Sequence, residues 1–120
     1  MSGRLTTHVL DTAHGRPAAG LEIAVWALDA GDTGCRRLKI AWTNHAGRVD
    51  VPLLADEELR PGRYELVFAV GAYFAALEPA LPNPPFLDEV PVRFGIADPA
   101  LHYHVPLLVS PWAYSTYRGS

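Results

Sequence analysis

The sequence predicts an all-β fold: an eight-stranded antiparallel two-sheet sandwich with one short helix. Three observations predict it. Eleven prolines and ten glycines are spread along the 120 residues and divide the chain into short segments. Most of these segments alternate apolar and polar residues with a period of two, as a half-buried strand does. The chain shows no strand–helix–strand rhythm, which would indicate a parallel sheet.

In the first half of the chain, four segments have the alternation of strands. The second, third and fourth strands are expected at residues 21–29, 38–43 and 49–53. Pro52 has no backbone N–H group, so it indicates a sheet edge or a strand end there. The first strand is expected at residues 5–11, and the side chains on one of its faces are Leu5, Thr7, Val9 and Asp11.

The second half of the chain contains the one expected helix. A strand at residues 63–70 is followed by the segment GAYFAALEP at 71–79, where good helix formers precede Pro79. These residues predict a helix of about two turns, which the proline ends. A proline-rich loop follows, and the last three strands are expected at 90–94, 101–109 and 112–117.

Composition limits the class of protein. Hydrophobic residues make up 49% of the chain and charged residues 19%, so residues 1–120 are expected to form a single folded domain rather than a disordered chain. A formal net charge of -3 does not suit a nucleic-acid binder. No apolar run approaches the roughly 20 residues that cross a bilayer. Cys35 is the only cysteine and no secretory signal is visible, so a cytoplasmic location is expected.

Histidines are the residues best suited to chemistry in this chain. His102 and His104 lie two residues apart in one expected strand, so both side chains point to one face. His8 lies in the first strand, where its neighbours on the same face do not explain a histidine. From spacing alone, a polar strand face or a hydrogen-bonded core histidine is the favoured explanation of the pair. His14 and His45 lie in turn-like segments and are interpreted as surface residues.

Two chemical functions of these histidines remain open. His8, His102 and His104 could hold a zinc ion with one open position, although no known zinc motif supports this hypothesis. Alternatively, a neutral histidine could take a proton from water, as the metal-free hydrolysis of an acyl bond requires. Arg48 follows the Asn-His-Ala-Gly turn, and its guanidinium would suit an anionic or carbonyl-rich substrate.

Three segments resemble the transthyretin-like 5-hydroxyisourate hydrolases. They are LTTHVLDTAHGRPAAG at 5–20, TNHAGR at 43–48, and HYHVPLLVSPWAYSTYRGS at 102–120. The resemblance covers the whole chain in order and length, and its most specific part is the terminal YRGS. Transthyretins that carry hormones share the preceding SP-x-x-YST segment but lack that ending and the histidines of the active site.

The resemblance implies a fold, a reaction and an assembly. It implies the eight-stranded transthyretin-like sandwich and a homotetramer built as a dimer of dimers, with active sites in the channel between dimers. The implied reaction belongs to urate degradation: hydrolysis of 5-hydroxyisourate to 2-oxo-4-hydroxy-4-carboxy-5-ureidoimidazoline. It implies no cofactor, no metal, and no partner other than the small-molecule substrate and further copies of the chain.

The resemblance also implies which residues act. His8, Arg48 and His104 match the catalytic positions of the family, while the role of His102 stays open. Either His8 or His104 is the general base. The terminal residues are expected to bind the substrate, and these are Tyr117, Arg118, Gly119 and Ser120. The alternative is a transthyretin-like carrier that binds a small aromatic ligand in the tetramer channel.

Overall fold

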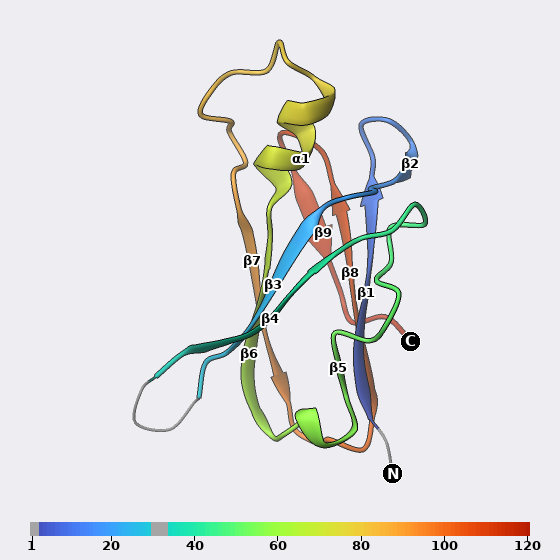
Figure 1. Ribbon diagram of the computed structural model, residues 1–120, viewed down its shortest axis with the longest axis vertical. Helices are drawn as coiled ribbons and strands as arrows, with labels where there is room; N and C mark the ends of the chain where they lie inside the picture. The colour runs from blue at the N-terminus through green and yellow to red at the C-terminus, as the bar shows by residue number, and fades with distance from the viewer. Residues whose placement is uncertain (1–2, 30–33) are drawn as a thin grey trace.

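A computed structural model describes residues 3–29 and 34–120 and contains two facing β-sheets with one α-helix at an end of the sandwich (Figure 1). The first sheet has the strand order β2-β1-β8-β9, with β5 also paired to β1, and the second has the order β4-β3-β6-β7. The elements are β1 (Arg4–Asp11), β2 (Arg16–Pro17), β3 (Glu22–Ala27), β4 (Arg36–Trp42), β5 (Leu54–Ala55), β6 (Gly62–Phe68), α1 (Val70–Leu77), β7 (Val90–Ile96), β8 (His102–Val109) and β9 (Tyr114–Thr116).

The predicted all-β sandwich with one helix is confirmed, with one exception to its antiparallel pairing. Strands β1 and β8 are parallel, and every residue of β1 has a partner in β8. A parallel pair needs a long crossover connection. Here that connection contains the whole second sheet, α1 and the short strand β5, which pairs with β1 on the way to β8.

The fourth predicted strand is wrong in its position. Residues 49–53 form no strand, and the two-residue strand β5 follows them at Leu54–Ala55. The Leu53 N–H still donates to the Leu5 carbonyl at 2.8 Å. The paired strand itself begins after Pro52, with Leu54 opposite Leu5 and Ala55 opposite Arg4.

The core lies between the two sheets and follows the predicted alternation. Leu5 and Val9 of β1 are fully buried, as the period of two requires, while Thr6 and His8 point to the outer face. Other strands of both sheets also contribute fully buried side chains to the core. The fully buried partners from β3, β6 and β8 are Ile23, Val25, Leu66, Phe68, Leu107 and Val109.

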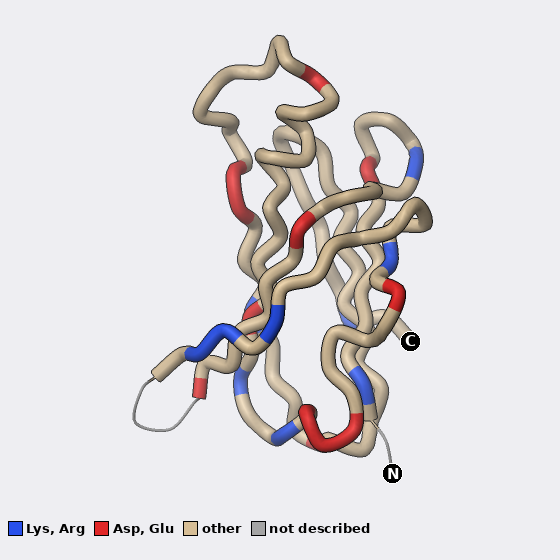
Figure 2. Tube along the Cα trace, in the orientation of Figure 1, with Lys and Arg blue, Asp and Glu red and all other residues tan. Residues whose placement is uncertain are grey.

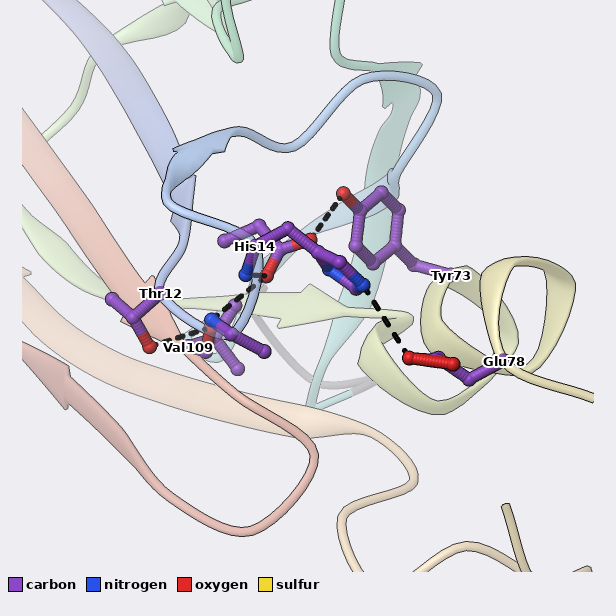
Figure 3. Close-up of polar contacts among 7 residues, drawn as sticks. Thr12, His14, Tyr73, Glu78 and Val109 are labelled. Atoms are coloured by element: carbon purple, nitrogen blue, oxygen red, sulfur yellow. Dashed lines mark hydrogen bonds and ion pairs between the residues drawn. The ribbon is translucent and has the colours of Figure 1, made fainter. Parts of the chain in front are cut away.

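A polar network ties the loop after β1 to the helix (Figure 3). The carboxylate of Asp11, 1% exposed, accepts hydrogen bonds from the Tyr73 hydroxyl at 2.8 Å and from His14 Nδ1 at 2.6 Å. The backbone N–H groups of Ala13 and His14 both donate to its other oxygen at 3.0 Å. His14 Nε2 lies 3.6 Å from the Glu78 carboxylate beyond the helix. The buried charge of Asp11 is therefore fully partnered.

Basic residues are spread over both sheets, with acidic residues between them (Figure 2). The densest basic group is Arg36, Arg37 and Lys39 on β4, and the Lys39 ammonium lies 3.4 Å from the carboxylate of Glu58. Among the residues described, no helix is long and apolar enough to cross a lipid bilayer.

Candidate active site

A groove on the outer face of the first sheet gathers three of the seven predicted site residues, Arg48, His104 and Ser120. Its volume is about 320 Å³. Its charged or titratable lining groups are Arg4, Arg48, His102 and His104, so positive or neutral groups surround it. The rest of its wall is formed by Thr6, Thr7, Val49, Val51, Leu53 and Ser120. Such a groove suits a small polar or anionic molecule.

The parallel pairing of β1 with β8 brings the histidines to this face. Thr6 lies opposite His104 in the register, and His8 lies opposite Pro106. Because partners in register point to the same side of a sheet, Thr6, His8 and His104 share the outer face with His102. The prediction that His102 and His104 share one strand face is confirmed.

Thr6 links the two histidines of β8. Its hydroxyl oxygen lies 2.9 Å from His102 Nε2 and 2.8 Å from His104 Nδ1. The two imidazole rings are 6.3 Å apart between centroids and inclined by 55°. Within residues 3–29 and 34–120, no three His, Cys, Asp or Glu side chains are arranged to hold a metal ion. The histidine pair instead has a hydroxyl partner.

The turn that carries Arg48 is fixed against β1. The Asn44 side-chain oxygen accepts hydrogen bonds from the backbone N–H groups of Ala46 at 2.9 Å and Arg48 at 3.2 Å. Gly47 has a φ of 75°, and a Cβ there would lie 2.4 Å from the Val9 carbonyl. The Val9 N–H also donates to the Gly47 carbonyl at 2.8 Å. Only glycine allows this approach, which sets Arg48 beside the histidines.

The electrostatics of the groove favour neutral histidines. Burial lowers the pKa of His104 below its usual range, and the charges of Arg48, His102 and His8 lower it further. Burial and Arg48 also lower the pKa of His8, against the opposing effect of a hydrogen bond with the Ala46 backbone. A lowered pKa leaves the imidazole free to accept a proton near neutral pH, as a general base must.

The last residues of the chain pack against His104. The Gly119 N–H donates to the His104 carbonyl at 2.8 Å, and the two residues form an isolated antiparallel bridge. A Cβ on Gly119 would lie 2.6 Å from Cδ2 of the His104 ring, so glycine lets the tail cross directly over the imidazole. This crossing places Ser120 on the groove wall.

Tyr117 and Arg118 lie away from the groove wall. The Arg118 guanidinium carbon stacks 4.5 Å from the centre of the Tyr103 ring, and Tyr103 belongs to the buried face of β8. Tyr117 is 58% exposed. Both line a second hollow of about 230 Å³ between β7 and β8, which His104 also lines. The exposed Arg118 side chain therefore anchors the tail on the Tyr103 ring while Ser120 reaches the groove.

Among the groove residues that the sequence interpretation missed, Thr6 and Arg4 are those with polar side chains that are not buried. Nothing local marks Thr6 as a partner of histidines nearly a hundred positions away. Thr6 can be recognised only from its register with β8, and that register can be assigned only once the parallel pairing of β1 with β8 is known. His8 does not line the groove itself, although it lies close enough to Arg48 and His104 for their charges to act on one another.

A larger hollow of about 890 Å³ lies elsewhere, between the ends of β4, β6 and the short helical turn at Asp56–Glu58. It contains no histidine or cysteine, and Arg63 in its wall is 3.4 Å from the carboxylate of Asp29. The groove beside His104 is thus the better candidate for acid–base chemistry.

Fold and groove together define a two-sheet β-sandwich with a candidate acid–base site on one outer sheet face. Comparison with known proteins adds the family. Residues 5–119 match the model of the HIUase/Transthyretin family, and the chain belongs to that family.

Curated relatives of this chain are enzymes. It is 60% identical to the 5-hydroxyisourate hydrolase of Mesorhizobium japonicum, over 98% of this chain and 93% of the relative. It is 56% identical to the 5-hydroxyisourate hydrolase of Ralstonia nicotianae, over 98% of this chain and 99% of that one.

Solved structures agree on the fold. The Klebsiella pneumoniae 5-hydroxyisourate hydrolase has a TM-score of 0.80 and 30% identity, covering 98% of this chain and 99% of its own. The transthyretin of Sparus aurata has a TM-score of 0.85 at 26% identity, covering 97% and 96%. Fold alone therefore does not separate enzyme from transthyretin, whereas identity to the curated hydrolases does.

Proposed function

We propose that this protein hydrolyses 5-hydroxyisourate to 2-oxo-4-hydroxy-4-carboxy-5-ureidoimidazoline. The observation that carries the proposal is the meeting of His104, Arg48 and Ser120 in one groove. They meet there in a chain 60% identical to a curated 5-hydroxyisourate hydrolase. The transthyretin-like carrier alternative is less well supported, because the solved transthyretin is only 26% identical.

The reaction requires a water to attack a ring carbonyl and the ring to open at its amide. A histidine takes the proton of the attacking water and returns it to the leaving nitrogen, and His104 and His8 have the lowered pKa that this role requires. Arg48 holds the substrate and stabilises the negative charge that develops on the carbonyl oxygen. No metal or cofactor takes part in the proposed reaction.

The tail is proposed to bind the substrate. Ser120 lies on the groove wall and offers its hydroxyl, while the Gly119 backbone fixes the tail to His104. Arg118 contributes through its anchor on Tyr103, and the exposed Tyr117 begins the tail directly after β9. Deleting residues 117–120 is expected to abolish activity.

The proposal includes a homotetramer, arranged as a dimer of dimers, in the cytoplasm. Several large apolar side chains are exposed near the groove and the edge strand β9, which supports a covered surface there. They include Val51, Trp112, Tyr114 and Tyr117. Light scattering of the protein as it elutes from a size-exclusion column measures its molar mass. The mass of a monomer would contradict the proposed tetramer.

The function is tested by generating 5-hydroxyisourate in the cuvette with urate oxidase and following its ultraviolet decay. Acceleration over the spontaneous decay, in the presence of a chelator, is the expected result. The absence of acceleration from folded protein would contradict the proposal. Activity that chelator removes and zinc restores would favour the zinc hypothesis on His8, His102 and His104.

Arg48→Lys is the matched variant for this assay. It keeps the charge but not the planar fork of donors, so it is expected to leave activity well below the wild-type rate. Near-normal kinetics would show that a positive charge alone suffices at this position.

A further inference from the structure

The hydroxyl of Thr6 touches two imidazoles and has only one proton to donate. Its oxygen is 2.8 Å from His104 Nδ1 and 2.9 Å from His102 Nε2. When both rings are neutral, the hydroxyl donates to one ring nitrogen and accepts from the N–H of the other. The tautomers of the two histidines are therefore coupled through Thr6.

The coupling allows two arrangements with opposite chemical consequences. In one, His104 Nδ1–H donates to Thr6 and the Thr6 hydroxyl donates to His102 Nε2, which leaves His104 Nε2 as a free acceptor. In the other, every donor is reversed, and His104 carries its proton on Nε2. Only the first arrangement lets His104 take a proton from water in the groove, because Nδ1 is already occupied by Thr6.

We propose that Thr6 and His102 are positioning residues that hold His104 as the Nδ1–H tautomer, so that its Nε2 is the general base. This inference rests on the proposed function and assigns the base that the sequence leaves open between His8 and His104. Water gives its proton to Nε2, the resulting imidazolium keeps Nδ1–H on Thr6, and Nε2–H then protonates the leaving nitrogen. The proton returns in full, so the histidine is regenerated.

The surroundings of the three residues fit this role. His102 is exposed, so its Nδ1–H can be satisfied by water while its Nε2 accepts from Thr6. The His104 ring is held on its other side by Gly119, whose N–H binds the His104 carbonyl and whose missing side chain makes room for the ring. A ring held on two sides cannot turn to exchange its nitrogens without breaking one of these contacts.

The test is Thr6→Val against Thr6→Ser. Valine keeps the shape and removes the hydroxyl, whereas serine keeps the hydroxyl. We expect Thr6→Val to lower kcat by about tenfold to hundredfold with KM little changed, because the tautomer is no longer fixed. Thr6→Ser should retain most of the activity. Equal loss in both variants, or no loss in Thr6→Val, would overturn the proposal.

A second variant and a spectroscopic measurement guard against a folding defect. His102→Ala removes the acceptor from an exposed position, so Thr6 turns its proton toward His104 Nδ1 and kcat falls in the folded protein. NMR of isotope-labelled histidine reads the tautomer without substrate. The expected result is Nδ1–H on His104 in the wild type and a shift toward Nε2–H in Thr6→Val. Finding Nε2–H in the wild type refutes the proposal.

The two measurements separate the proposals. If wild-type protein does not accelerate the decay of 5-hydroxyisourate, the proposed function fails. If it does accelerate the decay but His104 is the Nε2–H tautomer, only the assignment of the base fails.

Discussion

Strand β1 places a histidine cluster near each of its ends, and the partners of the two clusters differ in charge. On the outer face, Thr6 offers a neutral hydroxyl to His104, and Arg48 adds positive charge nearby. On the inner face at the other end, the carboxylate of Asp11 receives His14 Nδ1 at 2.6 Å. A hydroxyl beside cations keeps an imidazole neutral and able to accept a proton, whereas a carboxylate stabilises a donor in a fixed place.

The comparison shows how one strand separates reactivity from structural support. The Asp11 cluster joins the loop after β1 to α1 through the Tyr73 hydroxyl, and none of its members lines the groove. The Thr6 cluster joins no helix but opens to solvent in a groove of about 320 Å³. Changes at the first cluster should therefore alter stability, and changes at the second should alter turnover.

His104→Ala is expected to have the largest effect, and that effect should be on turnover. A positioned acid–base group contributes about 10²–10⁴-fold, so kcat should fall by that factor. The free energy of unfolding should change little, because His104 is only partly buried on an outer face. The coupled assay and thermal unfolding measure both quantities, and a wild-type rate would remove His104 from the mechanism.

Asp11→Ala should have the opposite profile. It leaves the Tyr73 hydroxyl and the His14 ring without their buried partner, so the free energy of unfolding should fall by about 3 kcal/mol. The turnover of the fraction that stays folded should match the wild type. Glu57→Ala, at an exposed acid, is the control and should change neither quantity. Urea titration measures the stability, and activity is measured at urea concentrations below the unfolding transition. A lowered kcat there would contradict the purely structural role of Asp11.

Gly119→Ala tests whether the tail positions His104 in the groove. The new Cβ would lie 2.6 Å from His104 Cδ2, so the tail or the ring must move. A displacement of this size should reduce kcat by about tenfold to hundredfold without loss of stability. Gly95→Ala is the matched control, since its Cβ would meet nothing closer than 4.0 Å. Equal kinetics in the two variants would show that the tail does not position His104.

Lowering the pH should affect kcat/KM through the Thr6 cluster and stability through the Asp11 cluster. The pKa values of His8 and His104 lie below the ordinary 6.5, so kcat/KM should fall as pH drops, with its midpoint below 6.5. Burial raises the pKa of Asp11, but hydrogen bonds from Tyr73 and His14 outweigh it and hold the pKa below the ordinary 3.8. Its contribution to stability is therefore present above 3.8 and is lost as pH falls through the lowered value.

The same sign argument applies to Tyr73 in alkali. Burial, followed by the neighbouring Asp11, raises the pKa of Tyr73 to about 12 from the ordinary 10.0. The stability that its hydrogen bond contributes is complete below 10.0 and is lost as pH rises through about 12. Activity lost only together with unfolding, at either end of the pH range, would contradict the division between clusters.

His14→Gln should have the smallest effect. The imidazole is partly exposed and its carboxylate partner keeps the Tyr73 hydroxyl, so unfolding should become easier by about 1 kcal/mol with unchanged kinetics. Thermal unfolding measures this loss. A lowered kcat at wild-type stability would connect this cluster to the groove.

Local pattern predicted much of the candidate site. The alternation along β1 predicted that His8 lies on the face opposite Leu5 and Val9, and the spacing of His102 and His104 predicted their shared face. The terminal residues were predicted as one binding segment, but the structure separates the groove wall at Ser120 from the Arg118 side chain on Tyr103. Residues of a tail have no helical or strand period to assign their directions, so the sequence could not divide them.

By itself, the sequence determined the sandwich class, the alternation of side chains along most of the long strands and the residue types needed for acid–base chemistry. It could do so because successive side chains in a strand point to opposite faces of the sheet. Tertiary structure alone decided that β1 pairs in parallel with β8, which brings Thr6 between His102 and His104. The choice of neighbouring strands depends on burying the whole core at once, and no local segment of sequence records it.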